Sequence, residues 1–320
     1  MLWNDLDHSF CESKILGLPE YINSFTSLFI SFFGIYGLQN KNNDIFVDIM
    51  YSTISILGIG SFGYHYTGTI GWALCDEVPM IVAVFIGIIY TEKVYNKIKK
   101  NKLILDSEET YLINLSSSNG NFRSLNGLMI DIFPSNSVLL HDMKNSIINY
   151  YPKSNILIHV FLMMFFIICN TMSNYRNLFP YFFASIVFYL FYKIEKIFDV
   201  LYLSNCTSEM KITRLPYLVE LRRRECHEGI QKSYNAMLTI IISCLIWVST
   251  EISCNYIKLN ILLIGHPMWH FFIGHGFYNL IQSIFYIKLN YSKKNIGKKY
   301  LIEYNKLYLL DIKELDKKYV

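Results

Sequence analysis

Long stretches of the chain contain no Asp, Glu, Lys or Arg, and these stretches set the predicted architecture. Seven of them approach or exceed the length of a membrane span: 21–40, 49–75, 78–91, 154–175, 177–192, 233–250 and 259–287. A helix needs about 20 apolar residues to cross a bilayer, and in lipid its backbone groups must be bonded internally. We therefore predict an all-α membrane protein with a seven-transmembrane helix bundle. The third and fifth stretches are the weakest candidates, so five or six spans are the alternative.

The distribution of basic residues predicts the orientation of this bundle. The segments after the third, fifth and seventh stretches are rich in Lys and Arg, whereas the alternate segments carry only Lys14, Arg176 and Lys258. Cytoplasmic loops carry the excess of basic residues, so we expect a luminal or outside N-terminus and a cytosolic C-terminus. The predicted organisation is one transmembrane domain over 1–290, with cytosolic insertions near 97–153 and 199–232, and a Lys-rich cytosolic tail over 291–320.

Composition agrees with a membrane protein and excludes several other classes. Hydrophobic residues make up 52% of the chain, and charged residues only 17%, against about 25% in ordinary soluble domains. This deficit excludes a disordered chain, a coiled coil and an ordinary nucleic-acid module. The 7 cysteines include no Cys-x-x-Cys pair, so neither a zinc ribbon nor a thioredoxin-type site is indicated.

Several polar residues fall inside or at the ends of the apolar stretches, where they are costly and often functional. His266 and His270 are four residues apart, as are Ser61 and His65, and residues at this spacing share one face of a helix. Asp76 stands at the start of the third stretch. In the predicted topology these five residues all lie in the outer half of the bundle, so we expect them to converge.

Three neutral imidazoles and a water form the ligand set of many catalytic zinc sites. In such a site Asp76 could act as general base, and Ser61 could donate a hydrogen bond to an oxyanion. An amide or ester carbonyl is the natural target. The residues alone leave an alternative, because histidines in spans often only bond across helices; we assign that role to His159 and His275.

Three separated motifs occur in a recognisable order. They are FCE at 10–12 with EYINS at 20–24, GSFGYH at 60–65 followed by DEVPM at 76–80, and HPMWH at 266–270 with Gly274. Together they resemble the alkaline ceramidase family of seven-span membrane hydrolases, which is related to adiponectin-receptor-like hydrolases. The resemblance implies a zinc-dependent amidohydrolase that cleaves the N-acyl bond of ceramide, giving a sphingoid base and a fatty acid.

The same resemblance implies specific roles for the converging residues. By position in the motifs, His65, His266 and His270 are the zinc ligands. Asp76 is the residue that transfers protons, and Ser61 is the partner of the oxyanion or of the attacking water.

The resemblance also implies a calcium site near the N-terminus, formed by Glu12 and Glu20 with Ser9 or Asp7. The match is incomplete, because Ser9 stands where the family has Asp and Lys14 stands where it has Asn. Asp7 would compensate through a shift in register. Calcium takes six to eight oxygen ligands, so Ca²⁺ is expected only if other oxygens complete the set.

Two further features follow from the resemblance and from the basic tail. The family joins an N-terminal cysteine to one before the seventh span, which implies a disulfide between Cys11 and Cys254 on the oxidising, luminal side. The chain carries Lys317 and Lys318 in a KKYV sequence that resembles an endoplasmic-reticulum retrieval signal. The expected location is therefore a multi-pass protein of the endoplasmic reticulum or Golgi.

The expected partners are ceramide or a related N-acyl lipid and the surrounding membrane lipids, with no nucleic acid. Two alternatives stay open. One is another lipid amide or ester hydrolase of the same superfamily, and the other is a non-enzymatic seven-span lipid receptor.

Overall fold

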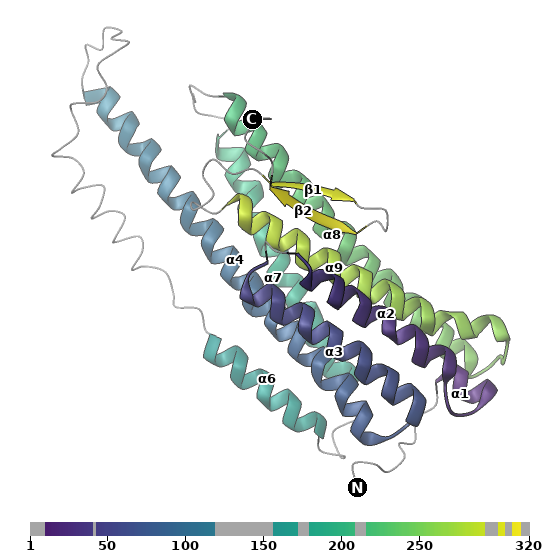
Figure 1. Cartoon of the computed structure of the whole chain (residues 1–320). Helices are drawn as coiled ribbons and strands as arrows, with labels where there is room; N and C mark the ends of the chain where they lie inside the picture. Colours follow the sequence, from purple (N-terminus) through teal and green to yellow (C-terminus); the bar gives the residue numbers. More distant parts are fainter. Residues whose placement is uncertain are drawn as a thin grey trace.

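The structure is a computed structural model that describes residues 10–40, 43–118, 156–171, 179–208, 216–291, 300–304 and 309–314. Within these residues the chain is mostly helical (Figure 1). The elements are α1 (Cys11–Leu16), α2 (Tyr21–Leu38), α3 (Ile45–Thr67), α4 (Ile70–Ser118), α6 (Ile156–Thr171), α7 (Phe179–Ser208), α8 (Pro216–Cys254), the 3-10 helix η2 (Asn260–Ile264), α9 (Gly265–Asn290), β1 (Tyr300–Tyr304) and β2 (Leu310–Glu314).

The long helices pack side by side into a bundle (Figure 1). Helix α9 contacts α2 on one side and α8 on the other, while α3 joins α2 to α4, and α4 carries α6 and α7. The short helix α1 lies against α8 and η2 at one end of the bundle. Helices α2 and α9, from opposite ends of the sequence, are therefore neighbours, and residues far apart in sequence meet between them.

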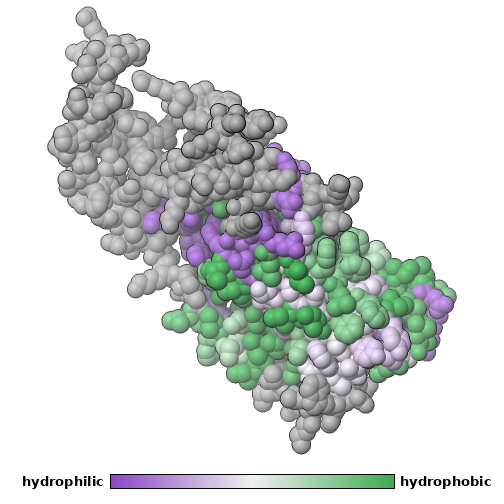
Figure 2. Space-filling model, in the orientation of Figure 1, coloured by the Kyte–Doolittle hydropathy of each residue, from purple (hydrophilic) through white to green (hydrophobic). Residues whose placement is uncertain are grey.

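The long apolar helices agree with the prediction that this is a membrane protein. Among the residues that the structure describes, four helical segments are long and apolar enough to cross a bilayer: Tyr21–Leu38, Ile45–Thr67, Ile70–Lys100 and His227–Cys254. A shorter apolar helical segment covers Leu157–Cys169. Figure 2 shows apolar side chains over much of the visible face of the bundle. A hydrophilic band crosses the middle of this view. Large side chains such as Phe25, Phe29 and Phe32 on α2 are exposed, as expected for helices that face lipid.

The predicted second span, 49–75, is divided between two helices. Helix α3 ends at Thr67, and Gly68 follows with φ 66°, a left-handed conformation that glycine adopts without a Cβ penalty. Helix α4 then begins at Ile70. Because of this turn, His65 occupies the last turn of α3 and Asp76 lies in the second turn of α4, on the neighbouring helix.

The segments predicted as polar excursions and tail contain more regular structure than the sequence indicated. Helix α4 continues to Ser118 and α8 begins at Pro216, within the insertions predicted at 97–153 and 199–232; residues 119–153 lie outside the described ranges. In the tail, β1 and β2 form an antiparallel hairpin, an exception to the all-α prediction. Leu309 and Leu310 are buried against the bundle, and the hydroxyl of Tyr278 on α9 donates to the carbonyl oxygen of Leu310 at 3.0 Å. The hairpin is therefore part of the folded bundle.

Small residues allow α2 and α3 to approach closely. A Cβ at Gly58 would overlap the backbone nitrogen of Ser31, and one at Gly34 would overlap the side chain of Ser55. The hydroxyl of Ser31 donates to the carbonyl oxygen of Ser55 at 2.7 Å. Close packing of this kind, with interhelical hydrogen bonds, holds helices together in lipid, where the hydrophobic effect provides little attraction between them.

The N-terminus of α2 is held by a carboxylate from outside the helix. The two oxygens of Glu12 accept the backbone N–H groups of Ile22 and Asn23, each at 2.8 Å. Glu12 is 2% exposed, and these N–H groups belong to the first turn, which has no acceptor within the helix. A negative charge there is also favoured by the helix dipole, so Glu12 fixes where α2 starts relative to α1.

We predict that Gly58→Ala lowers the stability of the detergent-solubilised protein by about 1–3 kcal/mol, because the new methyl group forces α2 and α3 apart. Gly87→Ala is the matched control, since its Cβ would meet only the flexible side chain of Leu190 at 3.4 Å, and alanine is the better helix former. Thermal unfolding measures both variants. Equal melting temperatures for the two would contradict the close contact between α2 and α3.

We predict that Glu12→Ala destabilises the protein by roughly 1–3 kcal/mol in calcium-free buffer, because two buried N–H groups lose their acceptor. Glu12→Gln retains one acceptor oxygen and should lie between Glu12→Ala and wild type. The measurement is again thermal unfolding in detergent. A Glu12→Ala variant as stable as wild type would show that Glu12 does not cap α2.

Candidate metal centre

Three histidines meet at the end of the bundle where α1 lies. His65, His266 and His270 each offer a ring nitrogen, and these atoms lie within 4.8 Å of one another. The three rings are 1%, 4% and 1% exposed, respectively. The pairs of ring centroids are separated by 4.8, 5.3 and 4.7 Å. The predicted convergence of His65, His266 and His270 is thus present in the fold.

Two helix ends supply these rings. His65 lies in the last turn of α3, and His266 and His270 lie in the first two turns of α9. The i, i+4 spacing places His266 and His270 on one face of α9, as predicted. A Cβ at Gly265 would overlap the side chain of Thr250 on α8, so the start of α9 is held tightly against α8.

The Nδ1 atom of His65 is bound by a carboxylate. It lies 2.6 Å from Oε2 of Glu20, which is fully buried. Burial favours the neutral form of Glu20, but the hydrogen bond with His65 opposes it and lowers the pKa of Glu20. Glu20 is therefore a carboxylate that accepts the Nδ1 proton of His65.

The Nδ1 atom of His270 is bound by a hydroxyl from α2. It lies 3.0 Å from Oγ1 of Thr26. The same hydroxyl lies 2.7 Å from the carbonyl oxygen of Ile22 and 3.2 Å from that of Asn23. When it donates to either oxygen, it can accept the Nδ1 proton of His270.

The Nδ1 atom of His266 has two neighbours on α8. Oε1 of Glu251 lies at 3.2 Å, and the indole N–H of Trp247 lies at 3.1 Å. With Glu20 and Thr26, these contacts place a polar partner at Nδ1 of all three rings. Outer partners of this kind are typical of metal-binding histidines, which use one nitrogen for the metal and the other for a hydrogen bond.

The N-terminal segment covers this cluster and is covalently attached beside it. Cys11 and Cys254 form a disulfide across 243 residues of sequence, which confirms the predicted pairing in the structure. The backbone N–H of Cys11 donates to Oε2 of Glu251 at 2.8 Å. The ring of Phe10 lies over those of His65 and His266, with centroids 5.0 and 4.7 Å apart.

Ser61 and Asp76 occupy the neighbouring part of α3 and α4. Ser61 is 3% exposed and lies one turn before His65. A Cβ at Gly60 would overlap the carbonyl of Cys75 and approach the backbone nitrogen of Asp76, so the first turns of α4 cross α3 next to Ser61. The catalytic roles predicted for Ser61 and Asp76 stay predictions, with both residues on the segments that flank the histidines.

The predicted calcium ligands are only partly within the described residues. Asp7 and Ser9 lie outside them. Glu12 and Glu20 both contact Asn23: its backbone N–H donates to Glu12, and its amide nitrogen donates to Oε2 of Glu20 at 3.2 Å. The buried Oδ1 of Asn23 has no hydrogen-bond partner within the described residues. The calcium site stays a prediction.

The remaining span histidines bond to other groups. His159 Nε2 lies 3.7 Å from Oε2 of Glu92 on α4. His275 lies 2.9 Å from the amide nitrogen of Asn279 on its own helix. Within the described part of the chain, the histidine cluster comprises His65, His266 and His270.

Sequence reasoning missed the partners of the three rings. Thr26 lies on α2, and Trp247 and Glu251 lie on α8. Neither helix carries one of the three histidines, and Glu251 directly follows the apolar run 233–250. One signal was available: Trp247, Glu251 and Cys254 are spaced for one helix face, and Cys254 is tied to the N-terminal motif.

Comparison with known proteins gives the family of this bundle. The family model described as Ceramidase matches residues 7–311, which include all three histidines, the disulfide and most of the hairpin. Members of this family are membrane hydrolases that act on the amide bond of ceramide. No individual curated protein shows significant similarity to the chain. On the strength of a match over nearly its whole length, the chain belongs to the ceramidase family.

Proposed function

We propose that this protein is a zinc-dependent hydrolase that cleaves the N-acyl amide bond of ceramide, producing a sphingoid base and a free fatty acid. The observation that carries the proposal is the cluster of three buried imidazoles with a polar partner at each Nδ1 atom. His65, His266 and His270 would hold the metal through their other ring nitrogens. The set fits zinc, which takes neutral imidazoles as ligands and keeps one position for water in catalytic sites.

When bound, zinc lowers the pKa of its water toward about 7 and polarises a carbonyl. The remaining chemistry falls to side chains next to the histidines. Asp76 accepts a proton from the attacking water and returns it to the leaving nitrogen of the amide. Ser61 donates a hydrogen bond to the oxygen of the carbonyl as it gains negative charge.

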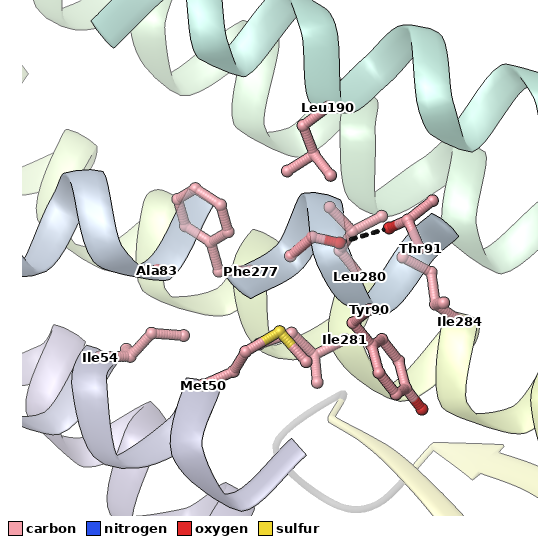
Figure 3. Close-up of a pocket in the computed structure, with 11 residues that line it drawn as sticks. Met50, Ile54, Ala83, Tyr90, Thr91, Leu190, Phe277, Leu280, Ile281 and Ile284 are labelled. Carbon is pink, nitrogen blue, oxygen red and sulfur yellow. Dashed lines mark hydrogen bonds between the residues drawn. The ribbon is translucent and has the colours of Figure 1, made fainter. Parts of the chain in front are cut away.

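We propose that a small apolar pocket between the helices marks the path of the acyl chain (Figure 3). It is lined by residues of α3, α4, α7 and α9: Met50, Ile54, Ala83, Gly87, Tyr90, Thr91, Leu190, Phe277, Leu280, Ile281 and Ile284. On α9 the lining residues follow His270 by 7 to 14 positions, or roughly 10–21 Å at 1.5 Å per residue. A lipid with its amide at the histidines would extend its acyl chain in this direction.

Charged contacts support the proposed seven spans, with the N-terminus luminal and the C-terminus cytosolic. Glu92 Oε2 lies 3.7 Å from both His159 Nε2 and Lys193 Nζ. These residues lie at the end of the third predicted span, the start of the fourth and the end of the fifth. Their contact supports a common depth for the ends of these three predicted spans, as alternating spans require, and that depth corresponds to the cytosolic side in the proposed orientation.

Two other functions remain as outcomes of the tests. A related hydrolase acting on another lipid amide or ester would keep the metal and prefer a different substrate. A lipid receptor would bind lipid without turnover, but it has no need of three buried histidines with hydrogen-bonded outer nitrogens, and this observation favours the hydrolase.

We predict that purified protein contains one zinc ion per chain and loses ceramide hydrolysis when the metal is removed by a chelator. Asp76→Asn should retain zinc and lose at least about 100-fold in turnover, since proton transfer by a positioned side chain contributes 10²–10⁴-fold. Asp199→Asn, an exposed position on α7, is the matched control and should behave as wild type. Wild-type turnover by the Asp76→Asn variant rejects the proposed base, and active protein without zinc rejects the metal.

We predict that Ala83→Leu alters the preference for acyl length, because the larger side chain fills the cavity of Figure 3. Hydrolysis of long-acyl ceramide should fall by roughly tenfold or more, in the range that separates well-fitting from ill-fitting apolar groups. Hydrolysis of a short-acyl ceramide should be preserved and serves as the internal control. If both substrates are hydrolysed as by wild type, the acyl chain does not occupy this cavity.

A further inference from the structure

The Nδ1 atom of His266 has neighbours that require opposite proton positions. The carboxylate of Glu251, at 3.2 Å, can only accept a hydrogen bond, so Nδ1 must carry the proton to bond with it. The indole N–H of Trp247, at 3.1 Å, can only donate, so Nδ1 must be free of the proton to bond with it. One nitrogen of a neutral imidazole cannot satisfy both neighbours.

The other two rings of the cluster do not show this competition in the contacts of their Nδ1 atoms. Nδ1 of His65 faces the carboxylate of Glu20, and Nδ1 of His270 faces a hydroxyl that can donate its own proton to the carbonyl oxygen of Ile22. Both neighbours can accept, so in both rings Nδ1 can carry the proton and leave Nε2 with the lone pair that a metal needs. His266 is therefore the ring whose tautomer depends on which neighbour it bonds.

We infer that Glu251 is a positioning residue that selects the metal-binding tautomer of His266, and that Trp247 favours the opposite tautomer. The inference rests on the proposed function, because it assigns a role toward the zinc site. When Glu251 accepts the Nδ1 proton, Nε2 of His266 presents its lone pair beside those of His65 and His270. When Trp247 donates to Nδ1, the proton moves to Nε2 and the ring is not a ligand.

The second oxygen of Glu251 explains how its carboxylate is directed at the ring. Oε2 accepts the backbone N–H of Cys11 at 2.8 Å, and Cys11 is joined by its disulfide to Cys254, less than one helical turn after Glu251 on α8. The Glu251 side chain is only 16% exposed. The N-terminal segment therefore fixes the carboxylate in the orientation that leaves Oε1 for His266.

The test measures metal affinity in the full-length protein, held in detergent, stripped of metal and titrated with Zn²⁺ against a competing chelator. Glu251→Gln retains the size of the side chain, but its amide oxygen is taken by the N–H of Cys11 and its NH₂ group donates toward Nδ1. We expect zinc affinity to fall roughly 10- to 100-fold, the usual effect of losing an outer partner of a metal-binding histidine. Trp247→Phe removes the competing donor and should bind zinc at least as tightly as wild type.

Glu228→Gln is the matched control. It removes a carboxylate from α8 at the opposite end of the apolar segment His227–Cys254 from Glu251. Its zinc affinity should equal that of wild type. Co²⁺ absorption spectra of the same proteins give a second measurement, and the Glu251→Gln spectrum should indicate a lost nitrogen ligand. Thermal unfolding of the metal-free proteins should show similar stability for wild type and Glu251→Gln.

Two results would overturn the inference. One is wild-type zinc affinity in Glu251→Gln, and the other is a loss in Trp247→Phe as large as that in Glu251→Gln. Either result would leave the proposed function intact if wild-type protein binds zinc and hydrolyses ceramide. Absence of zinc binding in the wild-type protein would instead reject the proposed function itself.

Discussion

Burying three imidazoles in an apolar bundle imposes the constraint on which the rest of this structure depends. Each ring has two nitrogens, and a ring that offers one of them to a metal must satisfy the other with a hydrogen bond, because unpaired polar groups are costly away from water. Here the partners come from Glu20, Thr26 and Glu251. These residues lie before α2, on α2 and on α8, so the requirement brings together helices that carry none of the three histidines.

The N-terminal segment is organised by the same requirement. Glu12 caps α2, Glu20 binds His65, and the amide of Cys11 binds Glu251. Each of these contacts fixes the segment against a different part of the bundle, and the disulfide to Cys254 closes the arrangement covalently. A short segment that the hydrophobic pattern left undefined is thus joined to three parts of the bundle by hydrogen bonds and to α8 by a disulfide.

The sequence predicted the helices and the clustering of the three histidines well, for a clear physical reason. Apolar runs in lipid must be helical, and an i, i+4 pair such as His266 and His270 fixes its own geometry. Relations between helices were harder to predict. The turn at Gly68 was hidden within a continuous apolar run, and Glu251 looked like the polar end of a span because its partner, His266, lies on another helix. The hairpin was missed because its buried Leu309 and Leu310 stand in a Lys-rich, otherwise polar tail.

Close approach between helices explains how the polar end of the bundle is built without large apolar contacts. Gly34, Gly58, Gly60 and Gly265 each face a neighbouring chain segment at a distance that a larger residue would not permit. Three of these contacts join α2, α3 and α4, and the fourth holds the first turn of α9 to α8. The helices that carry the rings are therefore held by close contacts with their neighbours.

The order of the chain has a consequence for biosynthesis. His65 and Glu20 leave the ribosome well before Glu251, His266 and His270. The complete set of imidazoles and partners can assemble only after α9 has been inserted beside α2, and the Cys11–Cys254 bond can close only once α8 is complete. The three-histidine cluster consequently assembles late, and a nascent or truncated chain that lacks α9 cannot form it.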